Sequence, residues 1–197
     1  MEDDFKNIVS TDWLEQHLEA PDIRIIDSSW YFPQEKRNAE QEFLECHIPG
    51  ASFFDIDKIK DNDSDLPHML PPSAMFNSTV RKLGIGDGHK VVIYDGLGMR
   101  SAARLWWMFK VFGYSDVVVL DGGFPKWVKE NRSTTADLTE KEIRHLTIYE
   151  DKSIVADRDD VLRATKLNHC SIIDARSEER FMGTAPEPRS GLRSGSI

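Results

Sequence analysis

The sequence is poor in cysteine and has no pairing pattern among the few it holds. Its two cysteines, Cys46 and Cys170, lie far apart and form no C-x-x-C spacing. A disulfide framework needs several cysteines, and a structural zinc site needs closely spaced pairs of ligands. The sequence therefore predicts neither, and we read both cysteines as structural or incidental thiols.

Long apolar runs are also lacking. No stretch approaches the length that a membrane-spanning helix needs. Residues 1–6 are acidic, without the apolar core of a signal peptide or the arginine-rich character of a mitochondrial transit peptide. We therefore expect a cytoplasmic location and no membrane partner.

Basic side chains are in the minority. The 25 lysines and arginines face 34 aspartates and glutamates, which gives a formal net charge of -9. Because binding to phosphate backbones scales with lysine and arginine, this balance argues against a nucleic-acid partner. The 40% of hydrophobic residues is typical of a globular protein, and 197 residues allow one domain or one domain and part of another.

Short apolar runs alternate with helical patterns along the chain. We predict strands over residues 23–27, 51–54, 91–94 and 117–120, and helices beginning near residues 11, 72, 101 and 124. This alternation predicts an α/β fold with an open, largely parallel sheet flanked by helices. Since sites in such sheets form where strands end, the loops that follow Asp27 and begin at Asp95 are the places to examine.

A polar, charged stretch divides the sequence and is followed by a partial repeat. Residues 7–10, 25–28 and 47–48 match residues 153–156, 172–175 and 196–197, in the same order and at nearly constant offset. We therefore predict a first domain over residues 1–132, a linker over 133–152, and the start of a second copy over 153–197. The second copy then stops after roughly a third of its length.

The loop at Asp95 suggests two functions, an aspartyl nucleophile or a phosphate-binding loop, but its other residues argue against both. An aspartyl nucleophile of the Asp-x-Asp type needs a second carboxylate, but Leu97 stands at that position. Gly96 and Gly98 suggest a phosphate cradle, yet no Lys-Ser or Lys-Thr follows them. We therefore interpret the two glycines as serving a tight turn.

Residues 43–51 carry the pattern F-x-x-x-H-I-P-G-A, and the sequence there resembles rhodanese-like domains. Five further segments resemble the amino half of tandem-rhodanese sulfurtransferases: residues 26–31, 54–57, 68–71, 104–109 and 120–123. Residues 181–189 are most similar to 3-mercaptopyruvate sulfurtransferases. Thiosulfate-preferring relatives tend not to have arginine at the position of Arg189.

The resemblance implies a chemistry and a departure from it. In this family a cysteine on a strand-to-helix loop of the second domain becomes a persulfide and passes its outer sulfur to a thiol or cyanide, without metal or organic cofactor. In this chain Asp95 stands at the matching position of the first copy, and the matching loop of the second copy would fall past Ile197. We therefore expect the 197-residue chain alone to be inactive. Ser196 also departs from the family, which usually has histidine there.

Three residues are candidates for the site. The resemblance implies acid–base support from Asp57 and His68, although a loop histidine and a turn-capping aspartate are the plain alternative. It also implies that Arg189 contacts the substrate carboxylate, whereas the nearby Arg176, Arg180 and Arg193 suit ordinary solvated surface charges.

Two functions remain open from the sequence. The first is a sulfurtransferase that takes sulfane sulfur from 3-mercaptopyruvate or thiosulfate, both small-molecule donors, and gives it to a thiol or cyanide. The alternative is a non-catalytic rhodanese-like module that binds a partner or regulates.

Overall fold

A computed structural model describes residues 7–167, 170–188 and 191–196 of the chain. The chain divides into two compact units, Met1–Ile154 and Val155–Ile197. They are called the first and the second unit below, and each is described by itself.

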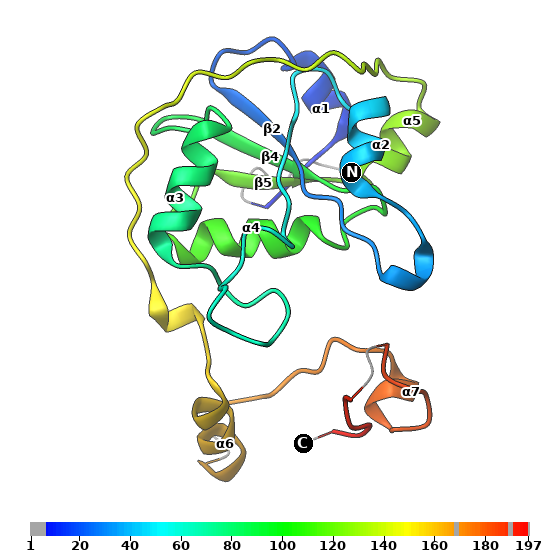
Figure 1. The fold of residues 1–197 in the computed structure, drawn as a ribbon, viewed down its shortest axis with the longest axis vertical. Coiled ribbons are helices and arrows are strands. Elements are labelled where there is room, and N and C mark those ends of the chain that lie inside the picture. Colours follow the sequence, from blue (N-terminus) through cyan, green and yellow to red (C-terminus); the bar gives the residue numbers. More distant parts are fainter. Residues whose placement is uncertain (1–6, 168–169, 189–190, 197) are drawn as a thin grey trace. The chain divides into compact units, whose positions relative to one another are not determined.

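The first unit is built on a five-stranded sheet with the order β1-β5-β4-β2-β3 (Figure 1). Every pair of neighbouring strands is parallel. The strands are β1 (Ile8–Val9), β2 (Ile23–Asp27), β3 (Ser52–Phe53), β4 (Lys90–Tyr94) and β5 (Val117–Leu120). The predicted parallel α/β sheet is thereby confirmed, with strands 23–27 and 117–120 at their predicted bounds.

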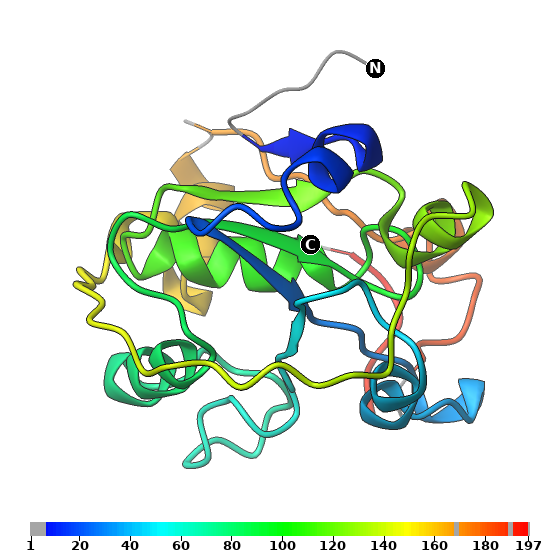
Figure 2. The ribbon, with the colours of Figure 1, turned by 90° about the horizontal axis from the view of Figure 1, so that it is seen from above.

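Helices cover both faces of this sheet, as Figures 1 and 2 show. The helices of the first unit are α1 (Thr11–Gln16), α2 (Ala39–Glu45), α3 (Ser73–Lys82), α4 (Ala102–Val111) and α5 (Gly123–Lys129), with the 3-10 turns η1 (Pro33–Glu35) and η2 (Lys152–Ile154). Helices α3 and α4 pack on one face, and α1, α2 and α5 pack on the other. Because both faces are covered, β5 is apolar throughout and β4 is apolar after Lys90 at its start.

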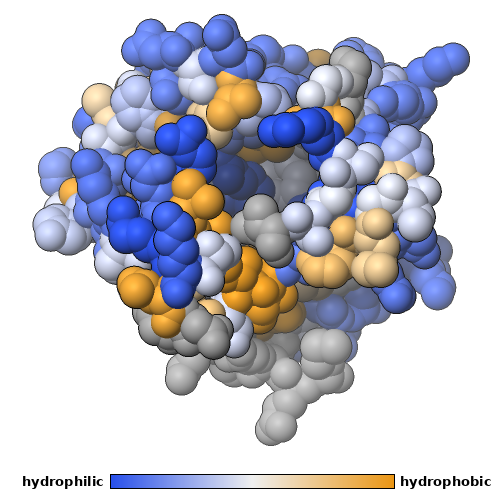
Figure 3. All heavy atoms as spheres, turned by 90° about the horizontal axis from the view of Figure 1, so that it is seen from below, coloured by the Kyte–Doolittle hydropathy of each residue, from blue (hydrophilic) through white to orange (hydrophobic). Residues whose placement is uncertain are grey.

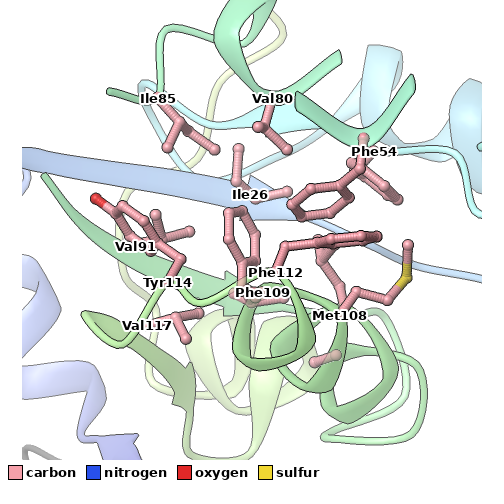
Figure 4. Packing of buried hydrophobic residues seen from close by; sticks show 14 of the residues in the cluster. Ile26, Phe54, Val80, Ile85, Val91, Met108, Phe109, Phe112, Tyr114 and Val117 are labelled. Atoms are coloured by element: carbon pink, nitrogen blue, oxygen red, sulfur yellow. The ribbon is translucent and has the colours of Figure 1, made fainter. Parts of the chain in front are cut away.

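Successive side chains of the strands enter two separate cores. Val91 and Ile93 point to one side of β4, whereas Val92 and Tyr94 point to the other, as the two-residue period of a strand requires. On the first side, Ile26 of β2 meets side chains of α3 and α4 (Figure 4). The sheet therefore lies between two hydrophobic cores and contributes side chains to both.

Local signals placed the helix ends well. The Ser10 Oγ accepts a hydrogen bond from the Trp13 N–H at 3.1 Å, which is the predicted cap of the first helix. On α3 the buried residues are Phe76 and Val80, while the predicted inward residue Met75 is only half-buried. The helical spacing predicts Met75, Val80 and Leu83 to face inward, and of these only Val80 is fully buried.

Residues 135–151, called the strap, run along the outside of the first unit past α3 (Figure 1). The strap is held at its start by two hydrogen bonds of 2.9 Å between the backbones of Thr135 and His47. Near its end, the Tyr149 N–H donates to the Phe112 carbonyl at 3.1 Å. Between these points Leu146 is 3% exposed and belongs to the core beneath α3 and α4.

The strap occupies most of the range 133–152, for which the composition predicts a linker. The first compact unit runs to Ile154 and includes the strap. Most residues of the strap are exposed, and the buried Leu146 together with the backbone hydrogen bonds fixes it to the domain. The average composition of the segment does not reveal that this one leucine is buried.

The second unit contains α6 (Arg158–Leu167) and α7 (Glu178–Phe181) and no strand among its described residues. Ile172 and Ile173, which match β2 in the repeat, are 47% and 88% exposed. Figure 3 shows that apolar patches stand out from a largely hydrophilic surface. Nowhere in the described ranges is a helix long and apolar enough to cross a membrane.

Replacing Leu146 by alanine tests whether the strap is part of the domain. We expect Leu146→Ala to lower the free energy of unfolding by about 2–5 kcal/mol, because it removes buried methyl groups and leaves a cavity. Urea denaturation followed by tryptophan fluorescence measures this change. Leu138→Ala is the matched control, since Leu138 lies on the same strap but is 62% exposed, and it should cost no more than about 0.5 kcal/mol. Equal effects of the two substitutions would contradict the packing role.

Candidate functional site

The candidate site lies where β2 and β4 end. The two strands are neighbours, and Asp27 at the end of β2 is in register with Tyr94 at the end of β4. Strand order reverses at this point, because β3 and β4 lie on opposite sides of β2. Crevices in parallel sheets form at such reversals. This edge is called the carboxyl edge below.

Asp95, the first residue after β4, has a fully buried side chain. Its Oδ1 accepts a hydrogen bond from the Leu97 N–H at 2.8 Å, and its Oδ2 accepts one from the Ala102 N–H, at the start of α4, also at 2.8 Å. A neighbouring N–H, that of Gly96, donates to the Ser29 Oγ at 2.8 Å. Backbone N–H groups at the start of a helix can bind anions. Here they instead donate hydrogen bonds to the side chains of Asp95 and Ser29.

Gly96 is required by a close approach. A Cβ at this position would stand 2.1 Å from the Tyr31 hydroxyl oxygen. That hydroxyl donates to Glu42 Oε2 at 2.8 Å, and the Arg37 guanidinium lies 3.8 Å from the centre of the Tyr31 ring. The glycine thus serves packing in the turn, in agreement with the structural interpretation of the loop.

A cavity of about 220 Å³ opens beside this loop. Its walls include Asp27, Tyr31, Gly96 and Cys46. Burial raises the pKa of Asp27 to about 6, against the opposing hydrogen bonds from Ser29 and Tyr94. Cys46 is half-buried at the end of α2, and Cys170 is exposed in the second unit. Neither cysteine lies on the loop that begins at Asp95.

The predicted pair of Asp57 and His68 is brought together. His68 Nε2 lies 2.6 Å from Asp57 Oδ1, and the Trp30 indole N–H donates to Asp57 Oδ2 at 2.9 Å. Because a carboxylate only accepts, this bond places a proton on Nε2 of the histidine. The Asp57 side chain is 59% exposed and that of His68 is 16% exposed. A second cavity of about 220 Å³ is lined by Trp30, Asp55 and Asp57.

Two residues that the sequence reasoning missed hold this pair in place. The Trp30 ring packs edge-on against the His68 ring, with centroids 4.9 Å apart. The Arg104 guanidinium donates to the His68 carbonyl and lies 4.6 Å from the centre of the Trp107 ring. His68 itself has a φ of 56°, a left-handed conformation uncommon for residues other than glycine. The position of Trp30 just after β2 was an available signal, because loops that follow strands form this edge.

His47 is a packing residue. It is fully buried, its Nδ1 lies 2.6 Å from the Phe43 carbonyl, and its ring stacks on Phe43 at 4.1 Å. These contacts hold the turn that follows α2.

The third predicted residue, Arg189, lies outside the described residues. Its neighbours Arg176 and Arg180 both bind Glu187, at 2.9 and 2.5 Å. They are therefore ion-pair partners of the segment that precedes Arg189, rather than solvated charges. In the described ranges no group of three or more His, Cys, Asp or Glu side chains is placed to hold a metal ion.

Comparison with known proteins agrees with this fold. The rhodanese-like domain family matches residues 10–130. The chain is 44% identical to thiosulfate/3-mercaptopyruvate sulfurtransferase 1, mitochondrial, of Arabidopsis thaliana, over 96% of this chain and 56% of that protein. It is 39% identical to 3-mercaptopyruvate sulfurtransferase of Rattus norvegicus, over 98% of this chain and 67% of the relative.

A solved structure of SseA from Escherichia coli, described as a 3-mercaptopyruvate sulfotransferase with the rhodanese fold, superposes with a TM-score of 0.86. The two sequences are 38% identical, and the match covers 96% of this chain and 71% of SseA. The chain belongs to the rhodanese-like domain family. It spans 56% and 67% of the length of the two curated relatives named above.

Asp95→Asn tests whether the carboxylate holds the loop. An asparagine side chain has only one acceptor oxygen, so one of the two N–H groups loses its partner in a fully buried position. We expect a loss of about 1–3 kcal/mol in the free energy of unfolding, measured by urea denaturation. The control Asp116→Asn changes the same charge where the side chain is 50% exposed, and should cost less than about 1 kcal/mol. An Asp95 variant no less stable than the control would refute the assignment.

Proposed function

We propose that this chain forms part of a sulfurtransferase that moves sulfane sulfur from 3-mercaptopyruvate or thiosulfate to a thiol or cyanide. The observation that carries the proposal is the Asp57–His68 pair at an open cavity, in a chain about 40% identical to proteins of that activity. The donor binds at the carboxyl edge, where Trp30 and Arg104 position the pair.

The pair suits the difficult step with mercaptopyruvate. A cysteine thiolate attacks the donor sulfur, the carbon–sulfur bond breaks, and its electron pair moves into the enolate of pyruvate. That enolate needs a proton on carbon, and a histidine oriented by a carboxylate is a general acid suited to supply it. Thiosulfate instead releases sulfite, which leaves with the electron pair and needs no proton.

In this proposal, the cysteine that forms the persulfide lies in a further segment. That segment corresponds to the part of the relatives that this chain does not cover. The second unit supports a repeat of the first: Asp27 Oδ1 accepts from the N–H two residues on at 2.8 Å, and Asp174 Oδ1 does the same at 2.9 Å. These two aspartates are matching positions of the proposed repeat. Ile173 beside Asp174 is 88% exposed, as expected of a strand without its neighbours.

Arg189 is proposed to bind the carboxylate of mercaptopyruvate. The ion pairs of Glu187 with Arg176 and Arg180 support this role, because they fix the residues just before it. A planar guanidinium fits a carboxylate with two parallel hydrogen bonds.

A non-catalytic binding module is the second candidate. It is favoured by Asp95, whose carboxylate fills the loop that would otherwise receive an anion. A cytoplasmic location stays a prediction, and the printed name of one relative includes "mitochondrial".

Activity assays on two lengths of protein test the proposal. We expect the 197-residue chain to release no sulfide from mercaptopyruvate above the rate of its Cys46→Ser, Cys170→Ser double variant. A protein extended to the length of the relatives should form a cysteine persulfide, detected by mass spectrometry as one added sulfur atom. Failure of the extended protein to form it with either donor would overturn the enzyme and favour the binding module.

A substitution of His68 tests the proton transfer in that extended protein. We expect His68→Ala to lower kcat with mercaptopyruvate by about 10²-fold or more, because the enolate loses its proton donor. Turnover with thiosulfate should change far less. His145→Ala is the control, since its side chain is 82% exposed on the strap, and it should alter neither rate. Equal losses with both donors would assign His68 a structural role instead.

A further inference from the structure

A cluster of cationic side chains lies at the opposite end of the sheet from the candidate site. Arg24 is at the start of β2, close to Lys90 at the start of β4, with which its strand neighbour Ile23 is in register. The strap passes the same place, and brings Lys141 and Arg144 to the turn at Gly84 and Gly86. None of these residues takes part in the Asp57–His68 site.

The turn and the strap are in tight contact. A Cβ at Gly84 would stand 2.9 Å from the Lys141 Cβ, and one at Gly86 would stand 2.6 Å from the Arg144 Cβ. The Arg81 Nε donates to the Arg144 carbonyl at 2.8 Å, which fixes the strap from the side of α3. The stems of the two cationic residues are therefore held against the turn.

Arg24 is satisfied only by neutral acceptors. Its Nε donates to the Gly84 carbonyl at 2.9 Å, and its Nη1 donates to the carbonyls of Pro21 and Ile23 at 2.9 and 2.7 Å. The carbonyl of Gly84 follows the end of α3, where a cation is favoured by the helix dipole. That attraction explains the Nε bond, but it leaves Nη2 without an acceptor in the described part of the chain.

Lys141 has no hydrogen bond or ion pair with any described residue, although it is only half-exposed. Burial, and then the charge of Arg24, hold the pKa of Lys141 below its usual value. Burial and the charge of Arg144 do the same to the pKa of Arg24. The nearby His89 responds alike, since burial and both arginines lower its pKa. Arg24, His89 and Lys141 are therefore each partly buried and close to another cationic side chain.

The carboxylates around the cluster neutralise only part of it, because Asp116 pairs with Lys90 and Glu142 with Arg144. Asp22 attracts both Arg24 and His89, but forms no ion pair with either within 4 Å in the described residues. Glu142 binds Arg144 at 2.9 Å, and its side chain is 80% exposed. The remaining positive charge is notable in a chain whose formal net charge is -9. An unpaired, partly buried lysine beside an arginine is costly, unless an anion joins them.

We propose that Arg24, Lys141 and Arg144 form a binding site for a tetrahedral dianion of the sulfate class, between the strap and the turn at Gly84–Gly86. Guanidinium groups offer a planar fork to such oxyanions, and the ammonium adds a point charge. Sulfate, phosphate and thiosulfate share this chemistry. The site lies away from the carboxyl edge. The proposal of an anion site therefore does not depend on the proposed sulfur transfer.

Isothermal titration of the 197-residue chain with sodium sulfate tests the site, with sodium chloride at equal ionic strength as the blank. We expect saturable binding to one site, weakened about tenfold or more by Lys141→Gln, because a charge-assisted contact is lost. Lys129→Gln is the matched control, since it removes the same charge from an exposed position on α5, and it should leave the affinity unchanged. Phosphate and thiosulfate titrations then show which dianion binds best.

A second measurement covers variants that fold poorly. Acetylation of the unmodified chain, followed by peptide mass spectrometry, should show that sulfate protects Lys141 several-fold and leaves Lys129 unprotected. Absence of saturable binding for all three dianions would overturn the proposal. So would equal weakening by the two lysine substitutions, or equal protection of the two lysines, because either result means that sulfate acts through ionic strength alone.

Discussion

The carboxylate of Asp95 is the interaction on which the carboxyl edge depends. It sits at the end of a central strand and binds the first N–H of α4 and an N–H of its own loop. The backbone carbonyl of the same residue accepts from the Phe124 N–H at 3.0 Å, which ties the loop to α5. One buried residue thus connects helices on both faces of the sheet. An anion built into the chain replaces one that would otherwise come from solution.

Two cavities open at this edge. Tyr31 lies against Gly96 in the wall of the first, and Trp30 and Asp57 line the second. Acidic groups gather at this edge, where Asp27 and Asp95 are both buried. The opposite end of the sheet carries the unpaired cations of Arg24 and Lys141. The two ends of one parallel sheet therefore differ in the ligands they suit, although the chain as a whole is acidic.

The predictions that succeeded depend on local patterns. The alternation of apolar runs with helical patterns predicted the parallel sheet, because strands buried on both faces are mostly apolar. The resemblance of residues 43–51 to rhodanese-like domains agreed with the family match over residues 10–130. Family likeness also singled out Asp57 and His68; the structure places them 2.6 Å apart, and their acid–base role stays a prediction. Nothing in the sequence indicated that the strap packs on the first unit, because its composition is polar and only Leu146 is buried.

From the sequence alone we obtained four of the five strands, the family, and the lack of a cysteine in the loop at Asp95; β1 and α2 were missed. Which distant groups meet followed only from the three-dimensional structure. Trp30 and Asp57 are 27 residues apart, and Arg24 and Gly84 are 60 apart, yet each pair is joined by a hydrogen bond of 2.9 Å. Such contacts are set by how strands stack and loops cross over them. No local pattern records that, because hydrophobic periodicity fixes which side of an element is buried but not which neighbour lies against it.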